Sequence, residues 1–255
     1  MRPSRASFEQ APELVGRCAF FLDLDGTLLD IIEHPHHVTV DDELLRLLKA
    51  LGRASGGALA IISGRTAADI DRLLANAGFC VAGQHGAERR DFSGKMHRHA
   101  VPLDALEEAR RSLWALAAKH PALVLEDKGV NLALHFRTAP GLRDEVLGAA
   151  RRLAGESGGA FEVQLGKMVV ELRPSGKDKG VAIAEFLEEA PFKGHTPVFV
   201  GDDLTDEFGF AMINRVGGHS VKVGEGESAA RWRLPDAAAV RAWLAAFVAR
   251  AGGDA

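Results

Sequence analysis

The chain has 255 residues, of which 47% are hydrophobic and 26% charged, a balance typical of a soluble globular protein. Its formal net charge of -4 excludes the strongly basic surface typical of nucleic-acid-binding proteins. No apolar run approaches the roughly 20 residues of a membrane-spanning helix, and the start has no signal-peptide core, so we expect a cytoplasmic protein without a membrane partner.

Short apolar runs alternate with helix-like segments at both ends of the chain. This alternation predicts an α/β domain with a parallel sheet and helices on both faces. The expected strands are 19–25, 57–63, 79–83, 196–203 and 219–224, and the expected helices include 41–53 and 66–77.

The middle of the chain has a different pattern, in which hairpins are interleaved with two helices. This pattern predicts an antiparallel sheet covered on one face, an α+β module at about 88–175 inserted into a core made of 1–87 and 176–255. The expected elements are a hairpin over 85–99, a helix over 104–120, two strands within 122–137, a helix over 140–154 and two strands within 160–174.

Three side chains are expected to pack in the interior. Cys18 and Cys80 lie beside apolar runs without the spacing of a zinc or redox site, so we interpret both as small core residues of a protein in a reducing compartment. Trp114 falls within a helical pattern, where packing is favoured over sugar stacking.

Acidic residues follow two of the expected strands directly. Asp23 and Asp25 end the first strand, and Asp202 and Asp203 end the strand at 196–203. The carboxyl ends of parallel strands form the ligand-binding edge of such sheets. So many carboxylates cannot all ionise together without a cation, and their hard oxygen atoms suit Mg²⁺.

Two further residues turn this acidic edge into a candidate phosphate site. Ser63 ends the strand at 57–63 with a hydroxyl, near backbone N–H groups that open a helix, and Lys179 lies near another helix start. A carboxylate held beside Mg²⁺ and a lysine can attack phosphorus and form an aspartyl phosphate.

Each motif alone has a simpler interpretation. "DLD" is compatible with a turn, "SGR" with a helix cap at Ser63, and "GDDLTDE" with an ordinary acidic helix start. Lys177 and Lys179 alone are compatible with a solvated surface. The joint occurrence of these motifs, each at the corresponding end of its element, favours the phosphate site.

The motifs "DLDGT", "SGR", "KDKG" and "GDDLTDE" resemble those of the haloacid dehalogenase superfamily of phosphohydrolases. Their order, with a large insert between the second and third, is similar to members with a C2-type cap. Together with "HGAE" and "ELRP", they are most similar to the trehalose-6-phosphate phosphatase family. The resemblance implies a Rossmann-like core, a small inserted cap and a Mg²⁺ cofactor.

The same resemblance implies roles for individual residues. Asp23 matches the nucleophile, and Asp25 matches the general acid/base, whose backbone carbonyl also binds the metal. Lys179 matches the motif lysine, and Asp202 the second metal carboxylate. The remaining matches are the phosphate-side or substrate-binding residues Thr27, Ser63, Gly64 and Arg65, and the supporting acids Asp203 and Asp206.

The implied activity is Mg²⁺-dependent hydrolysis of trehalose 6-phosphate to trehalose and phosphate, the final step of trehalose biosynthesis. Its partner is thus a small phosphorylated disaccharide. Other phosphorylated sugars remain open as substrates, namely mannosyl-3-phosphoglycerate and sucrose 6-phosphate. A phosphomutase and a non-catalytic phosphosugar sensor are weaker alternatives. The sequence leaves the oligomeric state open, and a monomer is compatible with it.

The inserted module is expected to determine the specificity for the sugar. Lys128 and Glu171 resemble cap residues that contact the sugar in this family, although each is equally compatible with a solvated strand edge. The clustered His34, His36 and His37 suggest a metal site at first sight. However, Pro35 breaks any helical spacing, so we interpret this segment as a solvated loop.

Overall fold

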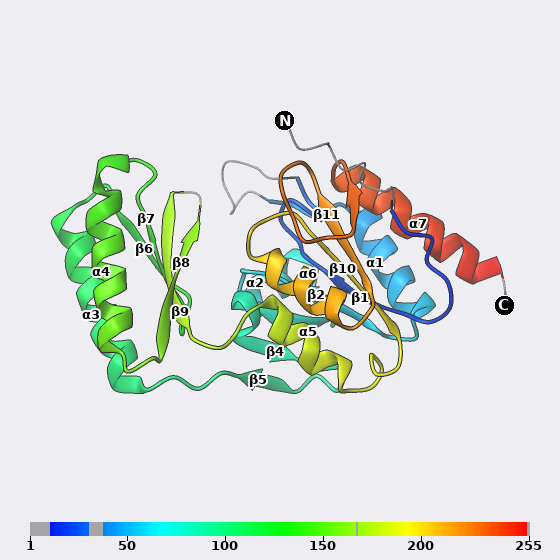
Figure 1. The fold of residues 1–255 in the computed structure, drawn as a ribbon, viewed down its shortest axis with the longest axis horizontal. Helices are drawn as coiled ribbons and strands as arrows, with labels where there is room; N and C mark the ends of the chain where they lie inside the picture. Colours follow the sequence, from blue (N-terminus) through cyan, green and yellow to red (C-terminus); the bar gives the residue numbers. More distant parts are fainter. Residues whose placement is uncertain (1–10, 31–37, 167, 254–255) are drawn as a thin grey trace, which may run out of the picture. The chain divides into compact units, whose positions relative to one another are not determined.

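The structure is a computed structural model that describes residues 11–30, 38–166 and 168–253 (Figure 1). The expected histidine loop, with His34, His36 and His37, lies outside the described residues. The chain divides into two compact units, Met1–His97 with Asp178–Ala255, and Arg98–Lys177.

The first unit is built on an eight-stranded sheet, as the strand–helix alternation predicted. The strand order is β12-β11-β10-β1-β2-β3-β4-β5, and the six strands from β12 to β3 are parallel. The strands are β1 (Cys18–Leu22), β2 (Leu59–Ile62), β3 (Cys80–Gly83), β4 (Glu88–Arg90), β5 (Met96–Arg98), β10 (Thr196–Gly201), β11 (His219–Val223) and β12 (Trp232–Leu234).

Helices cover both faces of this sheet (Figure 1). Along β1, Phe20 and Leu22 belong to the apolar cluster with α1 and α7, whereas Ala19 and Phe21 belong to the cluster with α5 and α6. Successive strand side chains point to opposite faces, so a strand covered on both sides must be apolar throughout. The helices are α1 (Asp42–Ala54), α2 (Ala67–Leu73), α5 (Lys179–Leu187), α6 (Asp206–Arg215) and α7 (Ala237–Gly253).

Helix α2 is shorter than the expected 66–77. It ends at Leu73, and the following Ala75 and Asn76 have left-handed φ values of 51° and 53°. Side chains with a Cβ rarely adopt this conformation, and it cannot continue an α-helix.

The β4–β5 hairpin corrects the expected arrangement of the middle segment. We expected it in the inserted module, but β4 pairs with β3 and extends the core sheet. Two arginines of β4 fix it there: Arg90 forms an ion pair with Asp71 of α2 at 2.6 Å, and Arg89 binds Glu189 beyond α5 at 2.8 Å. The second unit accordingly begins at Arg98, not at 88, and ends at Lys177, not at 175.

The second unit is a four-stranded antiparallel sheet in the order β6-β7-β9-β8. Its apolar cluster joins one face of the sheet to both helices, with Leu134 and Leu172 facing Leu113 and Val146. Trp114, which we expected to pack in the interior, is instead 52% exposed and is not part of this cluster. The elements are α3 (Leu103–Lys119), β6 (Val124–Asp127), β7 (Leu132–His135), α4 (Arg143–Glu156), β8 (Phe161–Gly166) and β9 (Val169–Pro174).

Two further predictions concern the cysteines and membrane-spanning helices. Cys18 and Cys80 are buried and free, as core residues should be. Among the described helices, none combines the length and apolarity that crossing a membrane requires.

Candidate active site

The carboxyl ends of three neighbouring strands bring the candidate residues to one edge of the sheet. The register pairs Leu22 of β1 with Val200 of β10, and the N–H of Asp23 donates to the Val200 carbonyl at 3.0 Å. Asp202 follows β10 just beyond this level, and Ser63 follows β2 on the other side of β1. Residues far apart in the chain thus converge because the strands are parallel and in register.

Three carboxylates gather at this edge. Oxygen atoms of Asp23, Asp202 and Asp206 all lie within 4.8 Å of one another. Burial raises the pKa of Asp23 well above its usual range, and burial together with the Asp206 charge raises the pKa of Asp202 to about 6. Both shifts reflect the cost of ionising neighbouring carboxyl groups in a buried setting, a cost that a bound cation would offset.

Lys179 supplies part of that positive charge. Its Nζ donates to Asp23 Oδ1 at 2.8 Å and to Asp206 Oδ1 at 2.6 Å, and the residue is only 2% exposed. Burial would lower the pKa of Lys179, but Asp206 and Asp23 outweigh that effect and raise it. Lys179 is the first residue of α5, whose cap Asp178 accepts the N–H of Val181 at 2.8 Å.

Asp206 has a larger part than the supporting one that the sequence suggested. Besides binding Lys179, its carboxylate accepts the N–H groups of Asp202 and Asp203 at 2.8 and 2.9 Å through Oδ2. Both of its oxygens are therefore engaged, Oδ1 with Lys179 and Oδ2 with the turn between β10 and α6. This leaves Asp23 and Asp202 as the carboxylates best suited to bind a metal.

The donor set fits Mg²⁺. Asp23 and Asp202 offer hard carboxylate oxygens, and a divalent cation would relieve the raised pKa values of the cluster. Gly26 lets the turn after β1 lie against Asp202, because a Cβ at this position would lie 2.1 Å from Asp202 Oδ2. Its φ of 84° also requires a glycine at this turn.

Several neighbours hold Asp202 and Asp203 in place. The hydroxyl of Thr27, which is fully buried, donates to Asp202 Oδ1 at 3.3 Å. Lys222 of β11, a residue that the sequence analysis missed, donates to the Asp202 carbonyl. Asp203 Oδ1 accepts the N–H of Thr205 at 2.8 Å and its hydroxyl at 2.6 Å. A lone lysine within the apolar run of 219–224 was the available sequence signal for Lys222.

The "SGR" segment shapes the opposite side of the edge. Ser63 is 2% exposed and its Oγ accepts the N–H of Arg65 at 3.2 Å. Helix α2 is capped by Thr66, whose Oγ1 accepts the N–H of Asp69 at 3.0 Å, so the alternative of Ser63 as the helix cap is wrong. The side chain of Arg65 binds the carboxylate of Asp25 through two hydrogen bonds.

A strained segment, Gln84–Gly86, supports the "SGR" turn and was also missed. Gln84 and His85 have φ values of 49° and 57°, which side chains with a Cβ rarely adopt. Their N–H groups donate to the carbonyls of Arg65 and Ser63 at 2.8 and 3.0 Å. The buried ring of His85 packs against Gly64, where a Cβ would lie 2.7 Å from it. The sequence contains "HGAE" but no sign of this strain.

The second unit holds the two expected sugar residues together. Lys128 Nζ forms an ion pair with Glu171 Oε1 at 3.0 Å, and their side chains are 13% and 11% exposed. Glu171 lies opposite Ala133 of β7 and Gln164 of β8, whereas its neighbours Val170 and Leu172 belong to the apolar cluster. The pair therefore lies on the sheet face that α3 and α4 do not cover.

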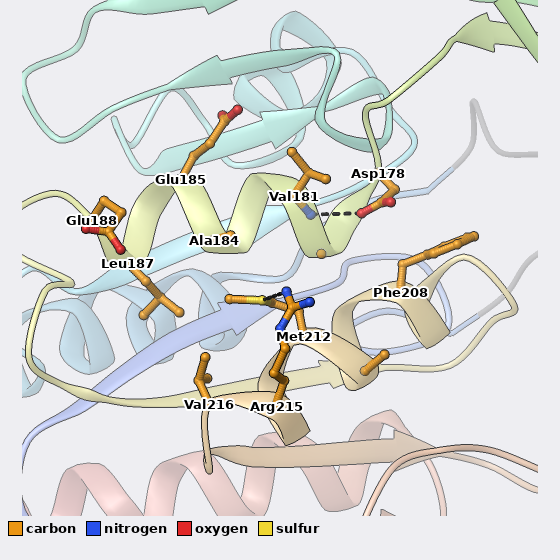
Figure 2. A pocket seen from close by; sticks show the side chains of 12 residues that line it. Asp178, Val181, Ala184, Glu185, Leu187, Glu188, Phe208, Met212, Arg215 and Val216 are labelled. Carbon is orange, nitrogen blue, oxygen red and sulfur yellow. Dashed lines mark hydrogen bonds between the residues drawn. The ribbon is translucent and has the colours of Figure 1, made fainter.

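A hollow of about 620 Å³ between α5 and α6 lies apart from this chemistry (Figure 2). Apolar side chains such as Leu187, Met212 and Val216 line it, together with Glu188 and Arg215. It contains none of the clustered carboxylates. The site is therefore assigned to the strand edge, where the charged groups converge.

Comparison with known proteins decides the family. The family model of trehalose-phosphatase matches residues 21–238. The chain belongs to the trehalose-phosphatase family. It is 47% identical over 235 residues to the trehalose-6-phosphate phosphatase of Escherichia coli (strain K12), a match that covers 92% of this chain and 88% of that protein.

Solved structures agree with the fold of this phosphatase. The C-terminal domain of the C. albicans trehalose-6-phosphate phosphatase superposes with a TM-score of 0.79 at 23% identity, covering 92% of this chain and 93% of that one. A haloacid dehalogenase-like hydrolase from Bacteroides thetaiotaomicron superposes with a TM-score of 0.65 at 17% sequence identity, covering 90% of this chain and 98% of that one. The phosphatase therefore has the α/β fold of the haloacid dehalogenase hydrolases.

Proposed function

We propose that this phosphatase hydrolyses trehalose 6-phosphate to trehalose and phosphate through an aspartyl phosphate on Asp23. The observation that carries the mechanism is the buried ion pair of Asp23 with Lys179, beside Asp202 and Asp206. The substrate rests on the family and on the similarity to the bacterial enzyme. The reaction would be the final step of trehalose biosynthesis in the cytoplasm.

Asp23 is the nucleophile in this scheme. Lys179 holds one of its oxygens at 2.8 Å, which fixes the carboxylate so that the other oxygen can attack phosphorus. The Lys179 ammonium then stabilises the negative charge on the transferring phosphoryl oxygens. Because Asp206 also binds Lys179 and orients the turn at Asp202, it keeps this arrangement assembled without touching the substrate.

Mg²⁺ would be held by the carboxylates of Asp23 and Asp202 and the backbone carbonyl of Asp25. When bound, it neutralises phosphate charge and orients the phosphoryl group for in-line attack. Ser63 offers a hydroxyl, and Gly64 a backbone N–H, on the phosphate side. Thr27, which matched a phosphate-side residue in the sequence, instead donates its hydroxyl to Asp202 and supports the metal side. Asp203 supports the metal side through the turn that it stabilises with Thr205.

Asp25 is the general acid and then the general base in this scheme. Its carboxyl protonates the sugar oxygen as the P–O bond breaks and the bond from Asp23 to phosphorus forms. The resulting Asp25 carboxylate then takes a proton from the water that attacks phosphorus. The bond from Asp23 to phosphorus breaks in this second step, which releases phosphate and restores both residues.

Lys128 and Glu171 are proposed to contact the sugar hydroxyls. An ion pair that is slightly exposed, on the sheet face opposite α3 and α4, offers both donors and acceptors to such a ligand. Mannosyl-3-phosphoglycerate and sucrose 6-phosphate are the rival substrates to test. A non-catalytic sensor is disfavoured because all the motif acids are present and Asp23, Asp202 and Asp206 are assembled.

A phosphate-release screen across phosphorylated sugars, with Mg²⁺ and with EDTA, tests the proposal. We expect trehalose 6-phosphate to give the highest kcat/KM, EDTA to abolish turnover, and Asp23→Asn to do the same while leaving the thermal unfolding cooperative. A preference for a monosaccharide phosphate would refute the substrate, and turnover by the Asn variant would refute the mechanism.

A further inference from the structure

Arg65 binds the side chain of Asp25 with the geometry of a fork. Nε donates to Oδ2 and Nη2 donates to Oδ1, each at 2.6 Å. The Arg65 side chain is 15% exposed, and that of Asp25 is 37% exposed. Two parallel charge-assisted hydrogen bonds of this kind fix both the position and the plane of a carboxylate, which a single bond does not.

The backbones at both ends of this ion pair are themselves fixed. The N–H of Arg65 donates to Ser63 Oγ at 3.2 Å, and its carbonyl accepts the N–H of Gln84 at 2.8 Å. On the other side, the N–H of Gly26 donates to the Leu29 carbonyl at 2.7 Å and closes the turn that follows Asp25. The guanidinium is thus a well-anchored support for a carboxylate on a short turn.

A general acid must point at the leaving oxygen within hydrogen-bonding reach, so its orientation limits the rate. We propose that Arg65 is a positioning residue that orients the Asp25 carboxyl for proton transfer, and that it is not a ligand of the phosphate. The inference rests on the proposed role of Asp25. It revises the grouping of Arg65 with the substrate-binding residues, because the Nε and Nη2 donors of its fork are engaged with Asp25.

The leaving group of the substrate provides the test. kcat/KM covers the steps up to departure of the leaving group. A sugar alkoxide needs a proton to leave, whereas p-nitrophenolate leaves without one. We expect Arg65→Ala and Arg65→Lys to lower kcat/KM for trehalose 6-phosphate about 10- to 100-fold, and for p-nitrophenyl phosphate less than about threefold.

The ratio of the two kcat/KM values is the measured quantity. Both rates scale with the folded fraction of the same preparation, so partial unfolding of a variant cancels. Arg72→Ala is the matched control, because Arg72 lies on α2 with a side chain 70% exposed and binds a neighbouring acid on the same helix, Asp69, at 2.7 Å. It should leave the ratio unchanged. KM for trehalose 6-phosphate should change little in the Arg65 variants.

The outcomes separate this inference from the proposed function. An equal loss on both substrates would show that Arg65 does not act on departure of the leaving group and would overturn the inference. Asp25→Asn should change the ratio in the same direction, and adding Arg65→Ala to it should change the ratio no further. If Asp25→Asn leaves the ratio unchanged, the role of Asp25 is wrong and the inference falls with it. If only the Arg65 variants leave it unchanged, the inference alone fails.

Discussion

Lys179 lies between two carboxylates with 2% of its surface exposed. Replacing it with Met would leave Asp23 and Asp206 buried without their cation. We expect kcat to fall about 100- to 1,000-fold, because the stabilising charge on the phosphoryl oxygens is lost. We also expect the free energy of unfolding to fall by about 3–5 kcal/mol.

Steady-state kinetics and urea unfolding check both expectations. Lys193→Met is a suitable control, because the Lys193 side chain is 68% exposed and its Nζ lies 3.7 Å from Glu188 Oε2. An exposed pair of this kind contributes about 0–1 kcal/mol. If Lys179→Met behaved like the control, the assigned electrostatic role of Lys179 would be wrong.

Protonation of the carboxylate cluster predicts an unusual pH dependence for the metal-free protein. The pKa of Asp202 is raised from an ordinary value of 3.8 to about 6 in the folded state, so the native state binds more protons than the unfolded chain between these two pH values. Stability in EDTA should therefore fall as pH rises from about 4.5 to 6, because a raised carboxyl pKa penalises the ionised native state. Asp23 and Asp206 shift in the same direction.

Urea midpoints in EDTA across this pH range measure the effect. Asp202→Asn should flatten the decline, and Mg²⁺ should offset it by binding the ionised carboxylates. If the free energy of unfolding in EDTA instead rose steadily over this pH range, the raised pKa values assigned to the carboxyl groups of the cluster would be wrong.

At the residue scale, the sequence predicted the acids and the lysine but not their partners. Asp23, Asp202 and Lys179 could be predicted as candidates because strand ends and helix starts are local patterns. The ion pair of Arg65 with Asp25 joins residues 40 positions apart, and only the sheet register places them together. His85 was missed because its left-handed backbone and its contact with Gly64 leave no mark in composition or spacing.

The β4–β5 hairpin is the element whose placement the sequence did not reveal. Its alternating pattern fits any antiparallel partner, and the partner turned out to be β3 of the core. Arg89 is 6% exposed at its side chain, binds Glu185 and Glu189 at 3.1 and 2.8 Å, and lies 4.8 Å from the Phe186 ring centre. This arginine therefore joins the hairpin to α5, the helix that begins with Lys179.

Arg89→Met should destabilise the protein by about 1–3 kcal/mol, because it leaves two partly buried carboxylates without their cation. Arg89→Lys should recover only part of this, since an ammonium cannot form the fork. Arg111→Met is the matched control, because Arg111 is 73% exposed in a pair within α3. Thermal unfolding measures all three, and a loss no larger for Arg89→Met than for the control would contradict the role given to Arg89.

For the whole molecule, the sequence predicted an α/β core with an inserted α+β module, because strand–helix alternation and hairpins differ in period. The predicted start of the module, at 88, lies ten residues before that of the compact unit Arg98–Lys177. The predicted end, at 175, lies two residues before the end of this unit. The physical reason at the first edge is the hairpin. Its two strands satisfy their hydrogen bonds by extending the core sheet.

The division into two units predicts that sugar recognition and phosphoryl chemistry can be separated. Lys128→Ala and Glu171→Ala should raise KM for trehalose 6-phosphate about tenfold or more, because each breaks the ion pair at 3.0 Å and removes a proposed sugar contact. Neither change should affect kcat/KM for p-nitrophenyl phosphate. Lys119→Ala is the control, since it breaks an exposed pair with Glu145 in the same unit. Equal losses on both substrates would argue against a sugar-specific role.

The central claim is that the phosphoryl group passes through Asp23. Rapid acid quenching during turnover of radiolabelled trehalose 6-phosphate, followed by peptide mapping, tests it most directly. We expect label on the peptide that contains Asp23, labile to hydroxylamine as an acyl phosphate is, and no label on the Asp23→Asn variant. Label on another residue, or normal turnover by Asp23→Asn with no labelled protein, would contradict it.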